Sequence, residues 1–364
     1  MGNDPIAAPE ASGRAAGVRP TMRDVAALAG VGVMTVSRVV NGRGGVGPER
    51  AARVWHAIEK LDYRHNVTAQ QLRRTGQPTA TIAVLLEDIA NPFAAEVLRA
   101  VEDVVSQHDW LVLCASSDGD GARERALLGA FCARRVDGLI IVPCGADHRY
   151  LLPELRRGTQ VVFADRPAPT IAADTVLSDN FGGARIAVAQ LVQAGHTRIG
   201  FLGDLRRIYT AQERYGGYLE ALRTAGIGPD ERLIRRDVHS QQSAVQATCE
   251  LFRDGSPPTA IFTAQNLLTI GARMALRSLG AERDVGHVGF DEIPLGNLLE
   301  PGITVVAQDP PAIGTLAAQL LLHRIANPGG EPETVEVPVR LLTRGSGEIS
   351  PPSGHARRPA HPAG

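Results

Sequence analysis

The chain has 364 residues, of which 44% are apolar and 21% charged, a composition typical of a globular protein with more than one domain. No run of about 18 uncharged apolar residues occurs, which argues against a membrane span. The first residues lack a basic segment followed by an apolar one, so no secretory signal is expected. The protein is therefore expected to be cytoplasmic.

The four cysteines are scattered along the chain without C-x-x-C pairs or neighbouring histidines. This spacing argues against a disulfide framework and against a metal site, and we expect neither a metal nor a cofactor. We interpret all four as reduced, buried side chains of small apolar character. They are Cys114, Cys132, Cys144 and Cys249.

The net charge of −1 hides an uneven distribution. From Pro20 to Pro78 there are nine Lys or Arg and four Asp or Glu, a net of +5, whereas residues 79–364 carry the opposite sign. A basic N-terminal segment on an acidic body is typical of a nucleic-acid-binding module joined to another domain.

Composition and periodicity divide the chain into five parts. Residues 1–19 are rich in Ala, Gly and Pro and are expected to be a disordered tail, as are residues 346–364. Residues 20–65 show short helical patterns, and residues 66–78 form a polar linker. Residues 79–345 alternate short apolar strands with amphipathic helices of 10–15 residues.

The alternation in residues 79–345 predicts parallel sheets covered by helices on both faces. It occurs in two successive series, the second after Ser178, which predicts two doubly wound α/β subdomains with a ligand cleft between them. Parallel sheets bind ligands at the carboxyl ends of their strands, so the cleft should lie there.

Residues 21–41, TMRDVAALAGVGVMTVSRVVN, predict a helix-turn-helix. Thr21 and Asp24 have the spacing of a capping box, and Gly30 stands where the first helix must end in a left-handed turn. Small or branched apolar side chains would form the contact between the two helices; these are Ala26, Ala29, Val36 and Val39. An ordinary helical hairpin within a core is the alternative.

In a helix-turn-helix the second helix enters the major groove of DNA with its first residues at the base edges. Val33 and Met34 stand at that position and could contact thymine methyl groups. Thr35 and Ser37 are beside them, and Arg38 could bind guanine or phosphate.

Residues 42–47, GRGGVG, match the G-x-G-x-x-G pattern of dinucleotide-binding proteins. That pattern binds a dinucleotide only between a strand and a helix, and here it follows the second helix of the predicted helix-turn-helix. We interpret it as a connector, after which Pro48 begins a third helix.

These segments together resemble the LacI/GalR family of transcriptional regulators. The resemblance covers roughly residues 20–345 and rests on DVAALAGVGVMTVSRVVNG, AIEKLDYRHNVTAQQLRR, NPFAAEVLRAVED, RRVDGLIIVP, LVQAGHTRIGFLG, TAIFTA, IGARMAL and VGFDEIP. It implies a small all-α head and a core like the periplasmic binding proteins. Its N-subdomain would comprise about 79–195 and 292–325, and its C-subdomain about 196–291 and 326–345.

The resemblance also implies how the protein would bind DNA. A homodimer, or a tetramer built from it, would place its heads on a palindromic operator, with 66–78 forming a hinge helix. Leu72 would wedge between base pairs in the minor groove and kink the duplex. The implied DNA-binding residues are Thr21, Val33, Met34, Thr35, Ser37, Arg38, Asn41, Asn66, Ala69, Gln70 and Leu72.

In the core the resemblance implies a cleft for a small-molecule effector, a sugar or sugar derivative. A carboxylate, two arginines and an aromatic ring suit a polyol, because the charged groups bind hydroxyls and the ring covers an apolar sugar face. The implied residues are Phe93, Asp165, Arg166, Thr210, Arg214, Gln265 and Asp291. A structural ion pair is the alternative for Arg214 and Asp291.

Several positions depart from the pattern of the family. Gly32 and Gly47 replace serines that would cap the second and third helices, at a cost of a few tenths of a kcal/mol. Ala94 replaces a second aromatic residue of the cleft, and Gln265-Asn266 replaces an Asn-Asp pair and so removes a negative charge.

The function predicted from these features is a ligand-responsive repressor of a carbohydrate-related operon, without catalytic chemistry. Whether the effector releases DNA or tightens its binding is left open. A sugar-binding protein with a vestigial head is one alternative, and a nucleotide-dependent α/β enzyme is another. The latter would need a glycine loop after the first strand, where the chain instead has VLLEDIANPF.

Overall fold

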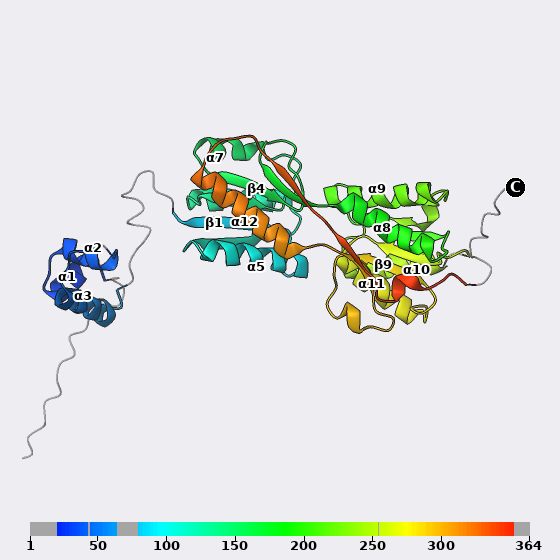
Figure 1. The fold of residues 1–364 in the computed structure, drawn as a ribbon, viewed down its shortest axis with the longest axis horizontal. Coiled ribbons are helices and arrows are strands. Elements are labelled where there is room, and N and C mark those ends of the chain that lie inside the picture. Colours follow the sequence, from blue (N-terminus) through cyan, green and yellow to red (C-terminus); the bar gives the residue numbers. More distant parts are fainter. Residues whose placement is uncertain (1–19, 43, 64–78, 254, 353–364) are drawn as a thin grey trace, which may run out of the picture. The chain divides into compact units, whose positions relative to one another are not determined.

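The computed structural model describes residues 20–42, 44–63, 79–253 and 255–352. The chain forms two compact units, Met1–Gln77 and Pro78–Gly364 (Figure 1). Among the described residues, no helix is both long and apolar enough to cross a membrane.

The described residues of the first unit form three helices, α1 (Met22–Ala29), α2 (Val33–Val40) and α3 (Pro48–Leu61). The capping box that begins α1 is present, and Gly30 ends the helix at φ 64°, a left-handed conformation that glycine adopts without strain. No side chain caps the first turn of α2 or α3, as the glycines before them predict. The small core confirms the predicted contact and consists of Val25, Ala26, Ala29, Val36, Val54, Ala57 and Tyr63, with Val39 packed against it.

The second unit contains two six-stranded sheets. The first has the order β11-β5-β4-β3-β1-β2 and is parallel throughout. Its strands are β1 (Thr81–Leu86), β2 (Leu111–Ser116), β3 (Gly138–Ile141), β4 (Gln160–Ala164), β5 (Asp174–Ser178) and β11 (Thr334–Val337). Helices α5 (Pro92–Ser106) and α12 (Pro310–Ala326) pack on one face, and α6 (Gly121–Ala133) and α7 (Leu152–Arg156) on the other.

The second sheet has the order β12-β10-β9-β8-β6-β7, with only β12 antiparallel to its neighbour. Its strands are β6 (Ile199–Leu202), β7 (Ile234–Arg235), β8 (Ala260–Thr263), β9 (Gly286–Phe290), β10 (Thr304–Ala307) and β12 (Arg340–Leu342). Helices α8 (Asn180–Gln193) and α9 (Tyr209–Thr224) cover one face, and α10 (Gln241–Arg253) and α11 (Asn266–Ser278) the other. The two predicted doubly wound subdomains are thus confirmed.

The boundaries predicted for the subdomains are wrong by one element each. The chain crosses between the sheets after β5, between β10 and α12, and between β11 and β12 (Figure 1). The predicted divisions at 195/196, 291/292 and 325/326 therefore assign α8, β10 and β11 to the wrong subdomain. Helix α8 packs on α9 and β9, β10 pairs with β9, and β11 pairs with β5. Strand–helix alternation predicts the order of elements but does not say which sheet each joins.

The C-terminal segment is ordered further than predicted. Residues Ser346–Glu348 form a 3₁₀ turn, η4, and Ser346 is fully buried. The Ser346 hydroxyl donates to the carbonyl of His287 and accepts from the amide of Thr304, 2.9 Å away. These bonds hold the start of the segment 346–352 on the second sheet, so the prediction of a disordered tail at 346–364 is wrong for residues 346–352. Residues 1–19 and 353–364 lie outside the described part.

The cysteines are less buried than predicted. Cys114 is exposed because β2 is the edge strand of its sheet, and Cys132, Cys144 and Cys249 are half-buried. Burial nevertheless raises the pKa of the Cys132 and Cys144 thiols to about 11, so both stay protonated at neutral pH.

Candidate functional site: an interdomain cleft and a helix-turn-helix surface

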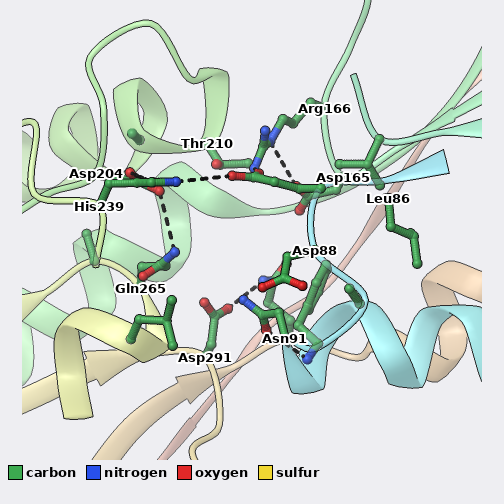
Figure 2. A pocket seen from close by; sticks show the side chains of 18 of the residues that line it. Leu86, Asp88, Asn91, Asp165, Arg166, Asp204, Thr210, His239, Gln265 and Asp291 are labelled. Carbon is green, nitrogen blue, oxygen red and sulfur yellow. Dashed lines mark hydrogen bonds and ion pairs between the residues drawn. The ribbon is translucent and has the colours of Figure 1, made fainter. Parts of the chain in front are cut away.

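A cleft with a volume of about 260 Å³ lies between the two subdomains of the second unit. Its walls come from segments that follow the carboxyl ends of strands in both sheets and from the first turns of nearby helices. Figure 2 shows side chains from both subdomains converging on it. This is where parallel sheets of this kind bind ligands.

All seven effector residues expected from the resemblance line this cleft. Phe93 lies in the first turn of α5, and Thr210 and Arg214 lie on α9. The others come within two residues of the ends of the strands β4, β8 and β9; they are Asp165, Arg166, Gln265 and Asp291.

Asp165 and Asp291 occupy equivalent positions in the two sheets. Each directly or almost directly follows a central strand, has a left-handed backbone (φ 66° and 71°) and is buried. Each amide also donates to a carbonyl of the next strand, Val176 in one sheet and Val306 in the other. Aspartate tolerates the left-handed region better than most residues, which lets the chain turn at the cleft edge.

Arg166 lies between two carboxylates of its own subdomain. Its guanidinium donates to Glu87 at the end of β1 and, over 3.2 Å, to Asp165. Burial opposes the charge on Arg166, but the two carboxylates together raise its pKa, while burial raises the pKa of Asp165. The Arg166 charge is therefore already neutralised within the cleft wall.

Arg214 is also held by several groups. Nε donates to Asn180 over 2.7 Å, and Nη1 donates to the carbonyl of Ala264 over 2.8 Å and lies 3.4 Å from Asp291. The guanidinium stacks on the ring of Phe290, 3.8 Å from its centroid. The ion pair that was an alternative for Arg214 and Asp291 is therefore present, and both side chains also line the cleft.

Several polar residues of the cleft were not predicted from the sequence. Their shared signal is position: Glu87 and Gln308 directly follow a strand, and Asp88, Asp118 and Asp204 come one residue later. They are Glu87, Asp88, Asn91, Asp118, Asp204, His239 and Gln308. Together with the expected residues they give the cleft six carboxyl groups and two arginines among the described lining residues.

Between described residues, three polar contacts join the two subdomains across the cleft. Asn266 donates to the Asn91 side-chain oxygen over 2.8 Å, and the reverse bond measures 3.4 Å. Arg207 donates to the carbonyl of Gly119 over 3.2 Å. His239, hydrogen-bonded to Asp204 over 2.7 Å in its own subdomain, also lies 3.7 Å from Glu87 of the other. These contacts link the two walls of the cleft.

In the first unit, the start of α2 presents exposed apolar side chains. Val33 is 41% and Met34 73% exposed, although Val36 on the same helix is fully buried. Thr35 and Ser37 are half-buried, and Arg38 is exposed. The surrounding surface carries further exposed cations, namely Arg23, Arg50, Arg53 and Lys60.

Two of the remaining expected DNA-binding residues have local structural roles. Thr21 caps α1, and Asn41 ends α2 by donating its side-chain amide to the carbonyl of Ser37 over 2.6 Å. The hinge residues Asn66, Ala69, Gln70 and Leu72 lie outside the described residues. In the part of the chain that is described, no cluster of His, Cys, Asp and Glu could hold a metal ion.

Comparisons with known proteins match both the helix-turn-helix region and the part of the chain that contains the cleft. Residues 21–66 match the lacI family of bacterial regulatory proteins, and residues 188–347 match the periplasmic binding protein-like domain. The ribose operon repressor of Haemophilus influenzae is 31% identical over 329 residues, which cover 90% of this chain and 98% of the relative.

Two solved structures are similar along nearly the whole chain. One is the lac repressor dimer bound to operator and the anti-inducer ONPF, with 26% identity, a TM-score of 0.79 and coverage of 91% of this chain and 99% of that one. The other is a complex of the transcriptional regulator CelR with cellobiose, with 31% identity, a TM-score of 0.67 and coverage of 90% and 100%.

Proposed function

The chain belongs to the LacI family of bacterial transcription regulators, and we propose that it is a homodimeric repressor that binds a palindromic operator and senses a carbohydrate in its cleft. One observation carries the proposal: the same chain presents an exposed helix-turn-helix surface and a polar cleft between two subdomains. The relatives are regulators of transcription rather than enzymes.

The start of α2 supports direct contact with bases. The Met34 side chain is too exposed to be stabilised by packing in the core of the head, whereas thymine methyl groups in a major groove would bury it. Val33 and Thr35 would lie beside it, and Arg38 with the other exposed cations would bind phosphates. Ser37 on the same helix and Asn41 at its C-terminal end would also contact the DNA.

The hinge is proposed from the resemblance alone. Leu72 would enter the minor groove at the centre of the operator, with Asn66, Ala69 and Gln70 on the same segment. Leu72→Ala should then weaken specific binding by about 1–3 kcal/mol and leave non-specific binding nearly unchanged. Equal losses on both kinds of DNA would exclude a wedge at this position.

The cleft supports a carbohydrate as the effector. Its lining is rich in acceptor oxygens from carboxylates and amides, which match hydroxyl donors, and Phe93 offers one ring to an apolar sugar face. Relatives named for ribose and a solved complex with cellobiose support the same class. Binding would change the closure of the two subdomains and so alter DNA affinity, typically by about 1–3 kcal/mol.

An exposed apolar surface supports dimerisation. It lies on α11 and on the segment 293–299 that follows β9, where Met274 is 50% and Leu298 70% exposed beside Ile270, Ile293 and Leu299. Exposed apolar patches of this kind mark protein–protein contacts, and a second copy of this chain is the partner we propose. Leu298→Glu should shift the mass measured by light scattering toward the monomer, whereas Gln246→Glu, at an exposed polar site on α10, should not.

The decisive experiment selects DNA from a random library with the full chain and measures binding of the selected sequence by fluorescence anisotropy. We expect a palindrome whose affinity falls steeply with salt, with a slope near −0.9 for each phosphate neutralised. Met34→Glu should abolish selection of that palindrome. A slope near zero, or enrichment of no sequence, would exclude the proposed repressor.

A further inference from the structure

The cleft contains two arginines, which at first sight favour an acidic effector such as a sugar phosphate or a uronate. The contacts of these arginines argue the opposite. Arg166 is held by Glu87 and Asp165, and Arg214 by Asp291, Asn180 and a backbone carbonyl. Neither arginine offers an uncompensated charge to a ligand.

The rest of the cleft adds negative charge. Asp88 and Asp118 lie at its exposed edge, and Asp204 lies in its wall against His239. Even with His239 protonated, the carboxyl groups of the lining outnumber the cations. In a partly buried site, repulsion between like charges is screened much less than on the surface.

We propose that Glu87 is the residue that excludes anionic effectors, by holding Arg166 as an internal ion pair so that the cleft accepts an uncharged polyol. Glu87 carries this role because it reaches Arg166 from a different strand, β1, at the edge of the cleft. Asp165 cannot substitute for it, since Asp165 is more deeply buried and holds Arg166 by the longer bond. The inference rests on the proposed function, because it specifies the ligand class of the same cleft.

The test uses Glu87→Gln, a change that keeps the size of the side chain and removes its charge. Arg166 would then keep only the longer contact with Asp165, and its outer nitrogen atoms would be released from Glu87 for an anionic ligand. The matched control is Asp118→Asn, which removes the same charge from the lining but from a carboxylate that pairs with Arg123 outside the cleft, 2.7 Å away. Circular dichroism and the melting temperature would establish that both variants fold.

Binding is measured by the shift in melting temperature and by calorimetry on the full-length protein. The probes are D-glucose, D-galactose, D-ribose and cellobiose, together with D-glucuronate, D-galacturonate and D-ribose 5-phosphate. For the wild type we expect binding of at least one neutral sugar and of no anion. Glu87→Gln should gain about tenfold or more in affinity for an anionic probe, the effect of one unopposed ion contact in a partly buried site.

Adding Arg166→Gln to Glu87→Gln should abolish that gain, because the charge that attracts the anion is then absent. Three results would overturn the inference: binding of an anionic probe by the wild type, an equal gain in Asp118→Asn, or no binding of any neutral sugar by the wild type. DNA binding is measured on the same samples. If it stays specific while the ligand tests fail, only this inference falls; if it is absent, the proposed function falls.

Discussion

A buried carboxyl group on α6, which covers one face of the first sheet, permits a quantitative prediction of the free energy of unfolding. Glu124 on α6 is 1% exposed and accepts hydrogen bonds from the amide of Cys144 over 2.7 Å and from the hydroxyl of Tyr150 over 3.1 Å, and its carboxylate lies 3.0 Å from His148 Nε2. Burial alone would raise the pKa of Glu124, but the bonds from His148 and Cys144 lower it from 4.5 to about 2. The ionised form is therefore strongly favoured in the folded protein.

The lowered pKa translates into folding free energy. A change from 4.5 to about 2 corresponds to about 3 kcal/mol at neutral pH, because each pKa unit is worth about 1.4 kcal/mol. Glu124→Gln keeps one acceptor for the Cys144 amide but cannot accept from His148 and Tyr150 at the same time. We therefore expect it to lower the free energy of unfolding by about 2–3 kcal/mol at pH 7.

The measurement is urea denaturation followed by Trp110 fluorescence in a Trp55→Phe background, so that only the core is observed. A group with a depressed folded pKa stabilises above its unfolded pKa, so the gap between wild type and Glu124→Gln should be full at pH 7. It should narrow as the pH falls below 4.5 and close near pH 2. Glu96→Gln, at an exposed site on α5, is the control and should change stability by less than about 0.5 kcal/mol. A difference of less than about 0.5 kcal/mol between wild type and Glu124→Gln, or a difference that does not depend on pH, would refute the reasoning.

Three further predictions concern the cleft. In Asn91→Ser the serine still caps α5 but is too short to reach Asn266. This variant should bind the effector about fivefold more weakly in calorimetry, and small-angle scattering should show a more open core. Unchanged affinity and unchanged scattering would mean that the bond between Asn91 and Asn266 does not favour closure. Arg214→Ala should abolish the effector response and cost about 3–5 kcal/mol in denaturation, since a buried pair loses one partner. The hydrogen bond to Asp204 raises the pKa of His239 above 6.5. The melting temperature of the wild type should therefore exceed that of His239→Gln most at pH values below 6.5. This difference in melting temperature should vanish as the pH rises through the raised pKa.

Local structure could be predicted from the sequence because its causes are local. The capping box of Thr21 and Asp24, the left-handed Gly30 and the proline that begins α3 each act within one turn of the chain. The crossovers could not be predicted in the same way. Helix α8 follows β5 with only Asp179 between them, yet it packs on the other sheet, since α9 and β9 bury its apolar side. Such a choice depends on contacts between residues far apart in the sequence.

The same distinction explains which cleft residues could be found. The resemblance supplied Asp165, Arg214 and Asp291 without any reference to their neighbours, whereas the role of Glu87 depends on a contact with Arg166, 79 positions further along the chain. An aspartate or glutamate after a buried strand is common, and its spacing does not say whether it meets a ligand or an arginine. The charge that a ligand meets is set by the pairs that the two sheets bring together. Two arginines taken alone would favour an anionic ligand, but the same arginines paired in the fold leave the cleft acidic.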